Sequence, residues 1–169
     1  MGIEYKAGSI NDTAWIKKLY ESVAEIEGGL ARSKDEITNE YVENFVNKSI
    51  NSGVIIIAIE VQSENIVGEI HCYSPGIKVF AHVLGELTIT VHPSYQGKKI
   101  GRMLFEKLLD KVKNEMPHIL RVELIARESN LKAIEFYKSL GFIIEGRLER
   151  RIKSVGGGFE ADIPMAWIR

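Results

Sequence analysis

The chain has 169 residues and 45% of them are hydrophobic, enough for one domain to form a core without disulfides or structural metals. Lysine and arginine (22 residues) nearly balance aspartate and glutamate (23 residues), and the formal net charge is −1. The overall charge therefore excludes a general attraction to nucleic acid or to an anionic membrane. We expect a single domain over residues 1–169.

Cysteine and histidine usage argues against disulfides and metal sites. Cys72 is the only cysteine, and the four histidines lack the paired spacing of metal ligands. The N-terminal stretch lacks the basic-then-apolar order of a signal peptide, and no apolar run approaches the roughly 18 residues that span a bilayer. We expect a cytoplasmic protein with no metal, no membrane contact and no nucleic-acid partner.

The first half of the chain predicts one strand, two helices and the start of a meander. Residues 3–7 form a short strand, and a helix capped by Asn11 or Asp12 follows, with apolar positions at Trp15, Leu19, Val23 and Ile26. Ser33 and Glu36 have capping-box spacing and predict the start of a second helix, which residues 51–53 end. Two β-branched runs, residues 54–61 and 66–73, predict an antiparallel hairpin, and a third strand covers about residues 85–91.

The second half predicts two helices and three further strands. From residue 99 to 115 apolar residues recur every fourth position, and they are Ile100, Leu104, Leu108, Val112 and Met116, with Met103 widening the stripe. A strand over 120–126 and a helix over 130–140 follow. Two last strands, 142–152 and 159–167, flank a turn of three glycines.

This element order predicts an α/β (α+β) fold with four helices and about seven strands in a mixed, mostly antiparallel sheet. The strands at 85–91 and 120–126 are joined by a helical crossover, so they should form a central parallel pair. A ligand is expected beyond the carboxyl end of the first of these two strands.

The sequence VHPSYQGKKIGR, residues 91–102, combines two glycines and three cations where a strand passes into a helix. Glycine lets backbone N–H groups approach a ligand, and a helix N-terminus carries unpaired donors, so this stretch predicts an anion site. A P-loop is excluded because Gly101 is followed by Arg102 rather than by lysine and a hydroxyl residue, and G-x-G-x-x-G is absent.

Two segments carry a resemblance to a known family. Gln96–Gly101 resembles the Q/R-x-x-G-x-G/A pyrophosphate loop of the GCN5-related N-acetyltransferases, the GNAT family, and Asn130–Phe142 resembles that family's N-x-x-A-x-x-F-Y-x-x-x-G-F segment. The element order matches over essentially the whole chain. The tail, from Glu145 to Met165, resembles the amino-acid and phosphinothricin acetyltransferase branch. The resemblance implies a GNAT-like fold and an acyltransferase that uses acetyl-coenzyme A.

The resemblance also implies where acetyl-coenzyme A binds. Backbone N–H groups of the loop would hold its pyrophosphate, the main chain of Ile89, Thr90 and Val91 would pair with the pantetheine arm, and Asn130 would contact that arm from the other side. The implied loop residues are Gln96, Gly97, Lys98, Lys99, Ile100, Gly101 and Arg102. Lys99 departs from the family, which usually has glycine there. Either Lys99 is already helical or its ammonium pairs with phosphate, and a solvated lysine pair is the plainer alternative.

The proposed chemistry is a direct attack of an amine in a ternary complex. Tyr137 is the candidate acid for the departing thiolate, although it could simply pack on the core. Glu86 matches a strand carboxylate that resembles the family's water-linked base, although it could be a solvated glutamate, and His82 is an alternative base. His71, Cys72 and Tyr73 are expected to be structural or pocket-lining, and a covalent route through Cys72 is disfavoured.

The candidate bases, Glu86 and His82, are weak, and this predicts which kind of amine the protein accepts. Neutralising a lysine-like amine at pH 7 costs roughly 4.6 kcal/mol, against about 1.4 kcal/mol for an α-amine, which favours an α-amino group of a small molecule such as an amino acid or analogue, or of a peptide N-terminus. The segment 25–35 and the cations Arg147, Arg150, Arg151 and Lys153 could select it, although these cations could be only a solvated edge. Alternatives are a protein N-terminal acetyltransferase and a non-catalytic coenzyme A-binding regulator. A homodimer through the last hairpin is also possible.

Overall fold

A computed structural model describes residues 2–154 and 156–169, and its elements follow the predicted order closely. The helices are α1 (Thr13–Ala24), α2 (Asn39–Ser52), α3 (Ile100–Glu115) and α4 (Leu131–Ser139). The strands are β1 (Ile3–Ala7), β2 (Gly53–Glu60), β3 (Ile66–Tyr73), β4 (Val83–Val91), β5 (Arg121–Arg127), β6 (Ile143–Ile144), β7 (Leu148–Lys153) and β8 (Phe159–Ile168).

The sheet has the predicted mixed topology. Its order is β1-β2-β3-β4-β5-β8-β6, with β7 also paired to β8, and every pair is antiparallel except β4 with β5. Within residues 2–154 and 156–169 the sheet has eight strands, because the predicted strand 142–152 is divided into β6 and β7. Pro164 of β8 accepts a hydrogen bond from Glu145 N through its carbonyl but has no N–H to donate back, so the ladder is interrupted there.

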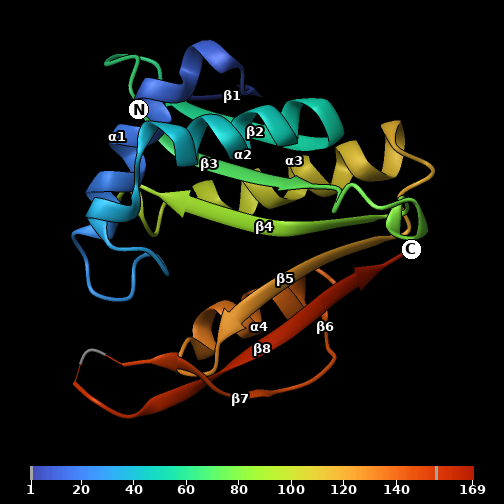
Figure 1. Ribbon diagram of the computed structural model, residues 1–169. Coiled ribbons are helices and arrows are strands. Elements are labelled where there is room, and N and C mark those ends of the chain that lie inside the picture. The colour runs from blue at the N-terminus through green and yellow to red at the C-terminus, as the bar shows by residue number, and fades with distance from the viewer. Residues whose placement is uncertain (1, 155) are drawn as a thin grey trace.

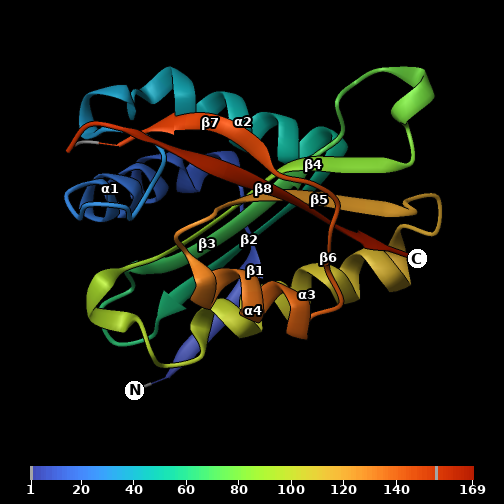
Figure 2. The same ribbon diagram turned by 90° about the horizontal axis from the view of Figure 1, so that it is seen from below.

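Helices cover both faces of the sheet, as Figures 1 and 2 show, with α1 and α2 on one face and α3 and α4 on the other. The core beneath α1 and α2 includes Ile16, Tyr20, Phe45 and Ile57. The core beneath α3 and α4 is larger, and a methyl group at Gly68 would lie 3.0 Å from both Ile100 Cγ2 and Leu104 Cδ1. The bare backbone at Gly68 therefore lets α3 lie close to β3.

The second helix begins later than predicted. Ser33 and Glu36 do form a capping box, but it caps a short 3₁₀ turn, Lys34–Glu36. Ile37 then leaves the helical conformation, with φ −88° and ψ 72°, and its side chain is buried. Helix α2 starts afresh at Asn39, where the Thr38 hydroxyl accepts a hydrogen bond from Tyr41 N at 3.1 Å.

Three residues predicted to face the core are exposed instead. Trp15 is 46% exposed and lies under the ammonium of Lys18, because the buried stripe of α1 passes through Ile16 and Tyr20. Ile26 lies beyond the end of α1 and is 44% exposed. Met103 is 40% exposed, since Phe105 widens the buried stripe of α3 on the other side.

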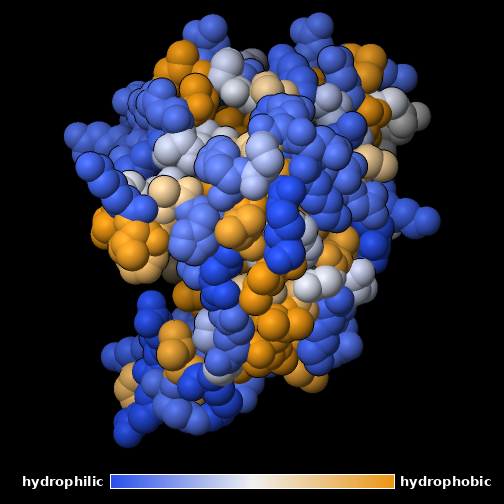
Figure 3. Space-filling view, turned by 90° about the vertical axis from the view of Figure 1, so that its right-hand side faces the viewer, coloured by the Kyte–Doolittle hydropathy of each residue, from blue (hydrophilic) through white to orange (hydrophobic). Residues whose placement is uncertain are grey.

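Apolar side chains also reach the surface around the last strands. Ile125, Ile143 and Ile168 are each about half exposed. Figure 3 shows apolar side chains, framed by hydrophilic ones, over the part of the molecule formed by β5, β6 and β8. The homodimer stays a prediction, as do the single domain and the cytoplasmic location. Within the described residues, no helix is both long enough and apolar enough to cross a membrane.

Candidate active site

The parallel pair opens into a wedge. β4 and β5 pair only at Val83 with Arg121 and at Leu84 with Val122, and the two strands then separate toward their carboxyl ends, as Figure 1 shows. Separation begins where β4 is irregular: the register with β3 shifts, and Glu86 has a φ of +53°. A bulge of this kind bends a strand and re-aims its side chains. The β5-facing edge of β4 beyond Glu86 is therefore left without a strand partner in the described chain.

A glycine-containing loop and the N-terminus of α3 follow β4. Gly97 has a φ of +76° with open space where a Cβ would stand, and Lys99 is left-handed, with φ 64° and ψ 9°. Helix α3 begins at Ile100, and its first intrahelical bond runs from Met103 N to Lys99 O at 3.1 Å. The N–H groups of residues 100–102 therefore precede that bond and point out of the helix N-terminus, as an anion site requires.

Side chains of this loop mostly brace it. Gln96 Nε2 donates to Val91 O at 3.3 Å, and Arg102 Nη2 donates to Ser139 Oγ at 3.2 Å while its guanidinium lies over the Phe136 ring. The ammonium of Lys98 lies 4.7 Å from the ring centroid of Tyr95. Arg102 thus ties α3 to α4. Because Lys99 is left-handed, the alternative that it is already helical is wrong.

Asn130 is the N-cap of α4. Its side-chain oxygen accepts a hydrogen bond from Ala133 N at 3.2 Å, which satisfies one free donor of the helix. Since the oxygen is used in the cap, the side-chain NH₂ group is what Asn130 can offer to a ligand. Its predicted contact with the pantetheine arm stays a prediction.

Tyr137, the predicted acid, lies in an aromatic cluster on α4. Its ring centroid is 5.4 Å from that of Phe105 and 6.2 Å from that of Phe142. Burial raises the pKa of its phenol above the usual 10, so the hydroxyl stays protonated at neutral pH and can donate a proton. Tyr137 does not line the cavities beside Glu86. Both the predicted packing role and the predicted acid role are compatible with this position.

Glu86, the predicted base, lies between two cavities at the wedge. One, of about 240 Å³, lies between the α1–α2 loop, α2 and the sheet, and the other, of about 320 Å³, lies between β4 and β5. Three residues line both cavities, and they are Ala31, Glu86 and Thr88. His82 lines neither cavity and stands in the turn before β4, so nothing in the geometry favours it as the base.

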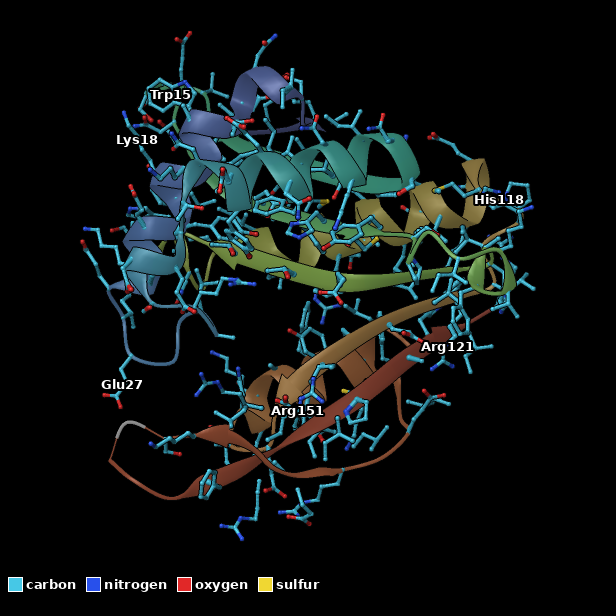
Figure 4. All side chains as sticks on the ribbon, viewed as in Figure 1. Trp15, Lys18, Glu27, His118, Arg121 and Arg151 are labelled. Atoms are coloured by element: carbon cyan, nitrogen blue, oxygen red, sulfur yellow. The ribbon has the colours of Figure 1, made fainter. Side chains whose placement is uncertain are left out.

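The α1–α2 loop forms one wall of the smaller cavity. Leu30, Ala31 and Arg32 line it, and the Arg32 guanidinium lies 4.2 Å above the Tyr41 ring. Figure 4 shows Glu27 of this loop at the open end of the wedge, whereas His118 and Arg121 lie at the far, closed end. The predicted acceptor-selecting segment therefore borders the candidate site, and Arg32 is the cation that it places there.

Most cations of the last hairpin have internal partners instead. Arg147 pairs with Glu128 and Glu149, Arg151 lies 3.4 Å from Asp162, and Arg150 lies over the Phe159 ring. The prediction that these residues recognise a carboxylate gains no support from this arrangement, and their alternative role as a charged edge fits it.

The sequence did not lead us to predict that two polar side chains of β3 are buried and hydrogen-bonded together. Glu69 and His71 are both buried, and Tyr20 of α1 donates to Glu69 Oε2 at 2.7 Å. The available signal was a glutamate and a histidine two residues apart in an otherwise apolar strand, which places both on one face. Cys72 points to the other face; burial raises its thiol pKa to about 12, so it is a poor nucleophile. Among the described residues, no cluster could hold a metal ion.

Comparisons with known proteins agree with this geometry. A model of the "Acetyltransferase (GNAT) family" matches residues 16–142. A ribosomal protein bS18-alanine N-acetyltransferase from Salmonella typhimurium is 39% identical over 87 residues, which are 50% of this chain and 57% of that protein. The L-amino acid N-acyltransferase MnaT from Escherichia coli is 29% identical over 69 residues, which are 41% of this chain and 38% of that protein.

A solved structure shares the fold over nearly the whole chain. It is a GNAT superfamily phosphinothricin acetyltransferase from Sinorhizobium meliloti in complex with acetyl-coenzyme A, with a TM-score of 0.83 and 15% identity. The match covers 99% of this chain and 89% of that one. By sequence, in contrast, the chain spans only about half the length of the curated relatives it matches.

Proposed function

Because the chain belongs to the GNAT acetyltransferase family, we propose that it transfers an acetyl group from acetyl-coenzyme A to the primary amine of a small molecule, an amino acid or an analogue. The observation that carries this proposal is the juxtaposition at the wedge: an open edge of β4 and the N-terminus of α3 on one side, and two small cavities meeting at Glu86 on the other. The strand edge and the helix N-terminus suit a long anionic donor, and the two cavities suit a small acceptor.

The residues at the wedge fit acetyl-coenzyme A. The N–H groups of Gly97 to Arg102 would hold the pyrophosphate, and the unpaired edge of Ile89–Val91 would pair with the amide groups of the pantetheine arm. Acetyl-coenzyme A supplies the acetyl group as a thioester. Lys98, Lys99 and Arg102 would add positive charge near the phosphates.

The chemistry needs an amine in its neutral form and a proton for the departing thiolate. Glu86 would accept a proton from the acceptor's nitrogen, directly or through one water, because it lines both cavities. Tyr137 would donate to the thiolate, because burial keeps its hydroxyl protonated. Transfer in one ternary complex requires no covalent intermediate, and this fits the buried, protonated thiol of Cys72.

Arg32 supports an acceptor that carries a carboxylate. It lines the same cavity as Glu86, so that cavity offers one cation and one anion, the complement of an amino acid's two charges. A protein N-terminus is the second candidate, favoured by the 39% identity to a ribosomal-protein alanine acetyltransferase. A peptide N-terminus has the amine but no carboxylate on the same residue, so Arg32 distinguishes the two acceptors.

An amine panel that follows the release of free coenzyme A thiol tests the proposal. The panel contains free amino acids, methionine sulfone, phosphinothricin, polyamines and short peptides, together with amino-acid amides that lack the carboxylate. Thiol release with amino acids but not with their amides is expected. Release with peptides alone would favour the protein acceptor. Acetyl-coenzyme A binding without release for any amine would contradict the proposed activity and favour a binding regulator.

Arg32→Gln and Lys34→Gln form a matched pair for the acceptor. Both remove a cation from the same loop, but Lys34 pairs with Glu25 and does not line the cavity. Arg32→Gln should lower kcat/KM for carboxylate-bearing acceptors by about 10- to 100-fold, the loss expected for one charged hydrogen bond. Lys34→Gln should leave it nearly unchanged. Equal effects of the two variants would contradict the role of Arg32.

A further inference from the structure

A hydrogen-bonded group of Tyr20, Glu69 and His71 is buried between the sheet and helices α1 and α2. Tyr20 Oη donates to Glu69 Oε2 at 2.7 Å, and His71 Nδ1 lies 3.0 Å from Glu69 Oε1. Glu69 is 0% exposed and His71 is 2% exposed. A buried carboxylate is costly unless its oxygens are hydrogen-bonded, and here each oxygen has a partner.

The geometry of this group determines which nitrogen of His71 is free. Burial and the nearby carboxylate raise the pKa of Tyr20 well above 10, so its hydroxyl remains a donor to Glu69. The other carboxylate oxygen accepts most favourably from a proton on Nδ1 of His71. A neutral imidazole with its proton on Nδ1 presents an unprotonated Nε2, which makes no hydrogen bond to any residue in the described ranges.

The His71 ring packs against two aromatic neighbours. It stacks on Phe45 with 4.1 Å between ring centroids and 8° between planes, and on Tyr73 with 6.1 Å and 4°. These contacts hold the ring in one plane, and the Glu69 contact limits its rotation within that plane. Nε2 is therefore held in a fixed direction, as a proton acceptor requires.

His71 lines the same cavity as Glu86 and Arg32. The register of β3 with β4 places His71 opposite Thr88, and Thr88 also lines that cavity. Titratable and charged groups that surround His71 come from every neighbouring element, and they are Tyr20, Arg32, Tyr41, Glu69, Tyr73 and Glu86. Thus a histidine backed by a buried carboxylate faces the proposed acceptor cavity, next to the carboxylate expected to act as base.

We propose that His71 is a catalytic base for the acceptor amine, with Glu69 and Tyr20 as positioning residues; this rests on the proposed function. In the step, an N–H bond of the acceptor's ammonium breaks, the proton bonds to Nε2 of His71, and the electron pair stays on the amine nitrogen. That nitrogen then bonds to the thioester carbonyl carbon and loses its second proton to Glu86, while the C–S bond breaks and the leaving thiolate takes the proton of Tyr137. The carboxylate of Glu69 stabilises the imidazolium, and the proton leaves through the open cavity to water.

Acceptors of different basicity separate a base from a structural residue. His71→Gln should lower kcat/KM about 10- to 100-fold for an alkyl amine, which is mostly protonated at pH 7. The same variant should change kcat/KM less than about threefold for the hydrazide analogue of that acceptor, whose terminal nitrogen is already neutral. A structural defect would lower both rates equally, and equal losses would overturn the proposal.

The roles of Glu69 and Tyr20 as positioning residues are tested by separate variants. Glu69→Gln and Tyr20→Phe should reduce the alkyl-amine rate but not the hydrazide rate, and both should shift the acidic limb of the pH profile of kcat/KM relative to the wild type. Tyr20→Phe is the safer variant, since it keeps the ring and the charge of Glu69. Acetyl-coenzyme A affinity should be unchanged in all three variants. An acidic limb in His71→Gln identical to that of the wild type would contradict the assignment.

A measurement that needs no turnover separates this proposal from the proposed function. Nitrogen-15 NMR of the His71 side chain in the wild-type protein should show that the neutral imidazole carries its proton on Nδ1 and none on Nε2. A proton on Nε2 with a bare Nδ1 would overturn the proposal whatever the activity is. Absence of thiol release in the wild-type amine panel would instead be a failure of the proposed function.

Discussion

Replacing Lys99 with glycine should make the protein more stable. Lys99 has φ 64° and ψ 9°, a left-handed conformation that costs a residue with a side chain about 1–2 kcal/mol. Glycine removes that strain but loses about 0.4–1 kcal/mol through the greater freedom of the unfolded chain. The middle of each range gives a net gain of about 0.8 kcal/mol, which corresponds to a rise in Tm of about 2–3 °C for a chain of this size.

Two matched variants make this measurement decisive. Lys98 has no positive φ, so Lys98→Gly should lower the free energy of unfolding by about 0.4–1 kcal/mol through the backbone, and by more through the lost contact of its ammonium with Tyr95. Lys99→Ala keeps the strain and removes the ammonium, so it should leave stability nearly unchanged. Urea denaturation followed by circular dichroism gives all three values. A loss of stability in Lys99→Gly equal to that in Lys98→Gly would refute the reasoning from backbone strain.

The same variants separate strain from charge in donor binding. Both Lys99→Gly and Lys99→Ala lack the ammonium but keep the backbone N–H, so we expect them to share the same small loss of acetyl-coenzyme A affinity in titration calorimetry. Tighter binding by Lys99→Gly alone would show that strain, rather than a missing charge, limits the loop.

Three further predictions concern the acid, the thiol and an ion pair. Tyr137→Phe should lower kcat far more than acetyl-coenzyme A affinity, and an unchanged kcat would remove its role as acid. Cys72→Ala should keep kcat, and intact mass after acetyl-coenzyme A alone should show no acetylated protein; an acetyl group on Cys72 that is lost on adding acceptor would contradict direct transfer. Arg121 holds the pKa of Glu145 below its usual value, so this pair stabilises above about pH 4.5 and its contribution is lost as pH falls through the lowered pKa. Glu145→Gln should therefore cost about 0.2–1 kcal/mol at pH 7 and progressively less as the pH is lowered below about 4.5 in urea denaturation, whereas an equal loss at every pH would contradict the pairing.

Local patterns in the sequence were enough for most of the fold. Alternation and β-branched runs predicted the β2–β3 hairpin, whose second strand, Ile66–Tyr73, has the predicted bounds, and the fourfold spacing from Ile100 predicted α3 within one residue. The helical crossover required a parallel β4–β5 pair. These features depend on neighbours in the chain, and such neighbours are visible in a sequence.

Other features were decided by packing. The capping box at Ser33 was present but opened only a 3₁₀ turn, because the buried Ile37 leaves the helical conformation. The exposed sides of Trp15 and Met103 depended on which stripe of each helix the sheet covers. Sequence spacing specifies that a helix has an apolar face, but not where that face is centred when several apolar residues compete for it.

The sequence by itself determined the proposed donor side of the site: a strand, a glycine-containing loop and a helix N-terminus are contiguous, so their backbone donors must lie together. Only the tertiary structure decided the proposed acceptor side. Arg32, His71 and Glu86 come from a loop and two different strands, and the bulge in β4 and the packing of α1 and α2 on the sheet bring them into one cavity. Contacts between residues distant in the chain depend on how the layers pack, and no local pattern records that packing.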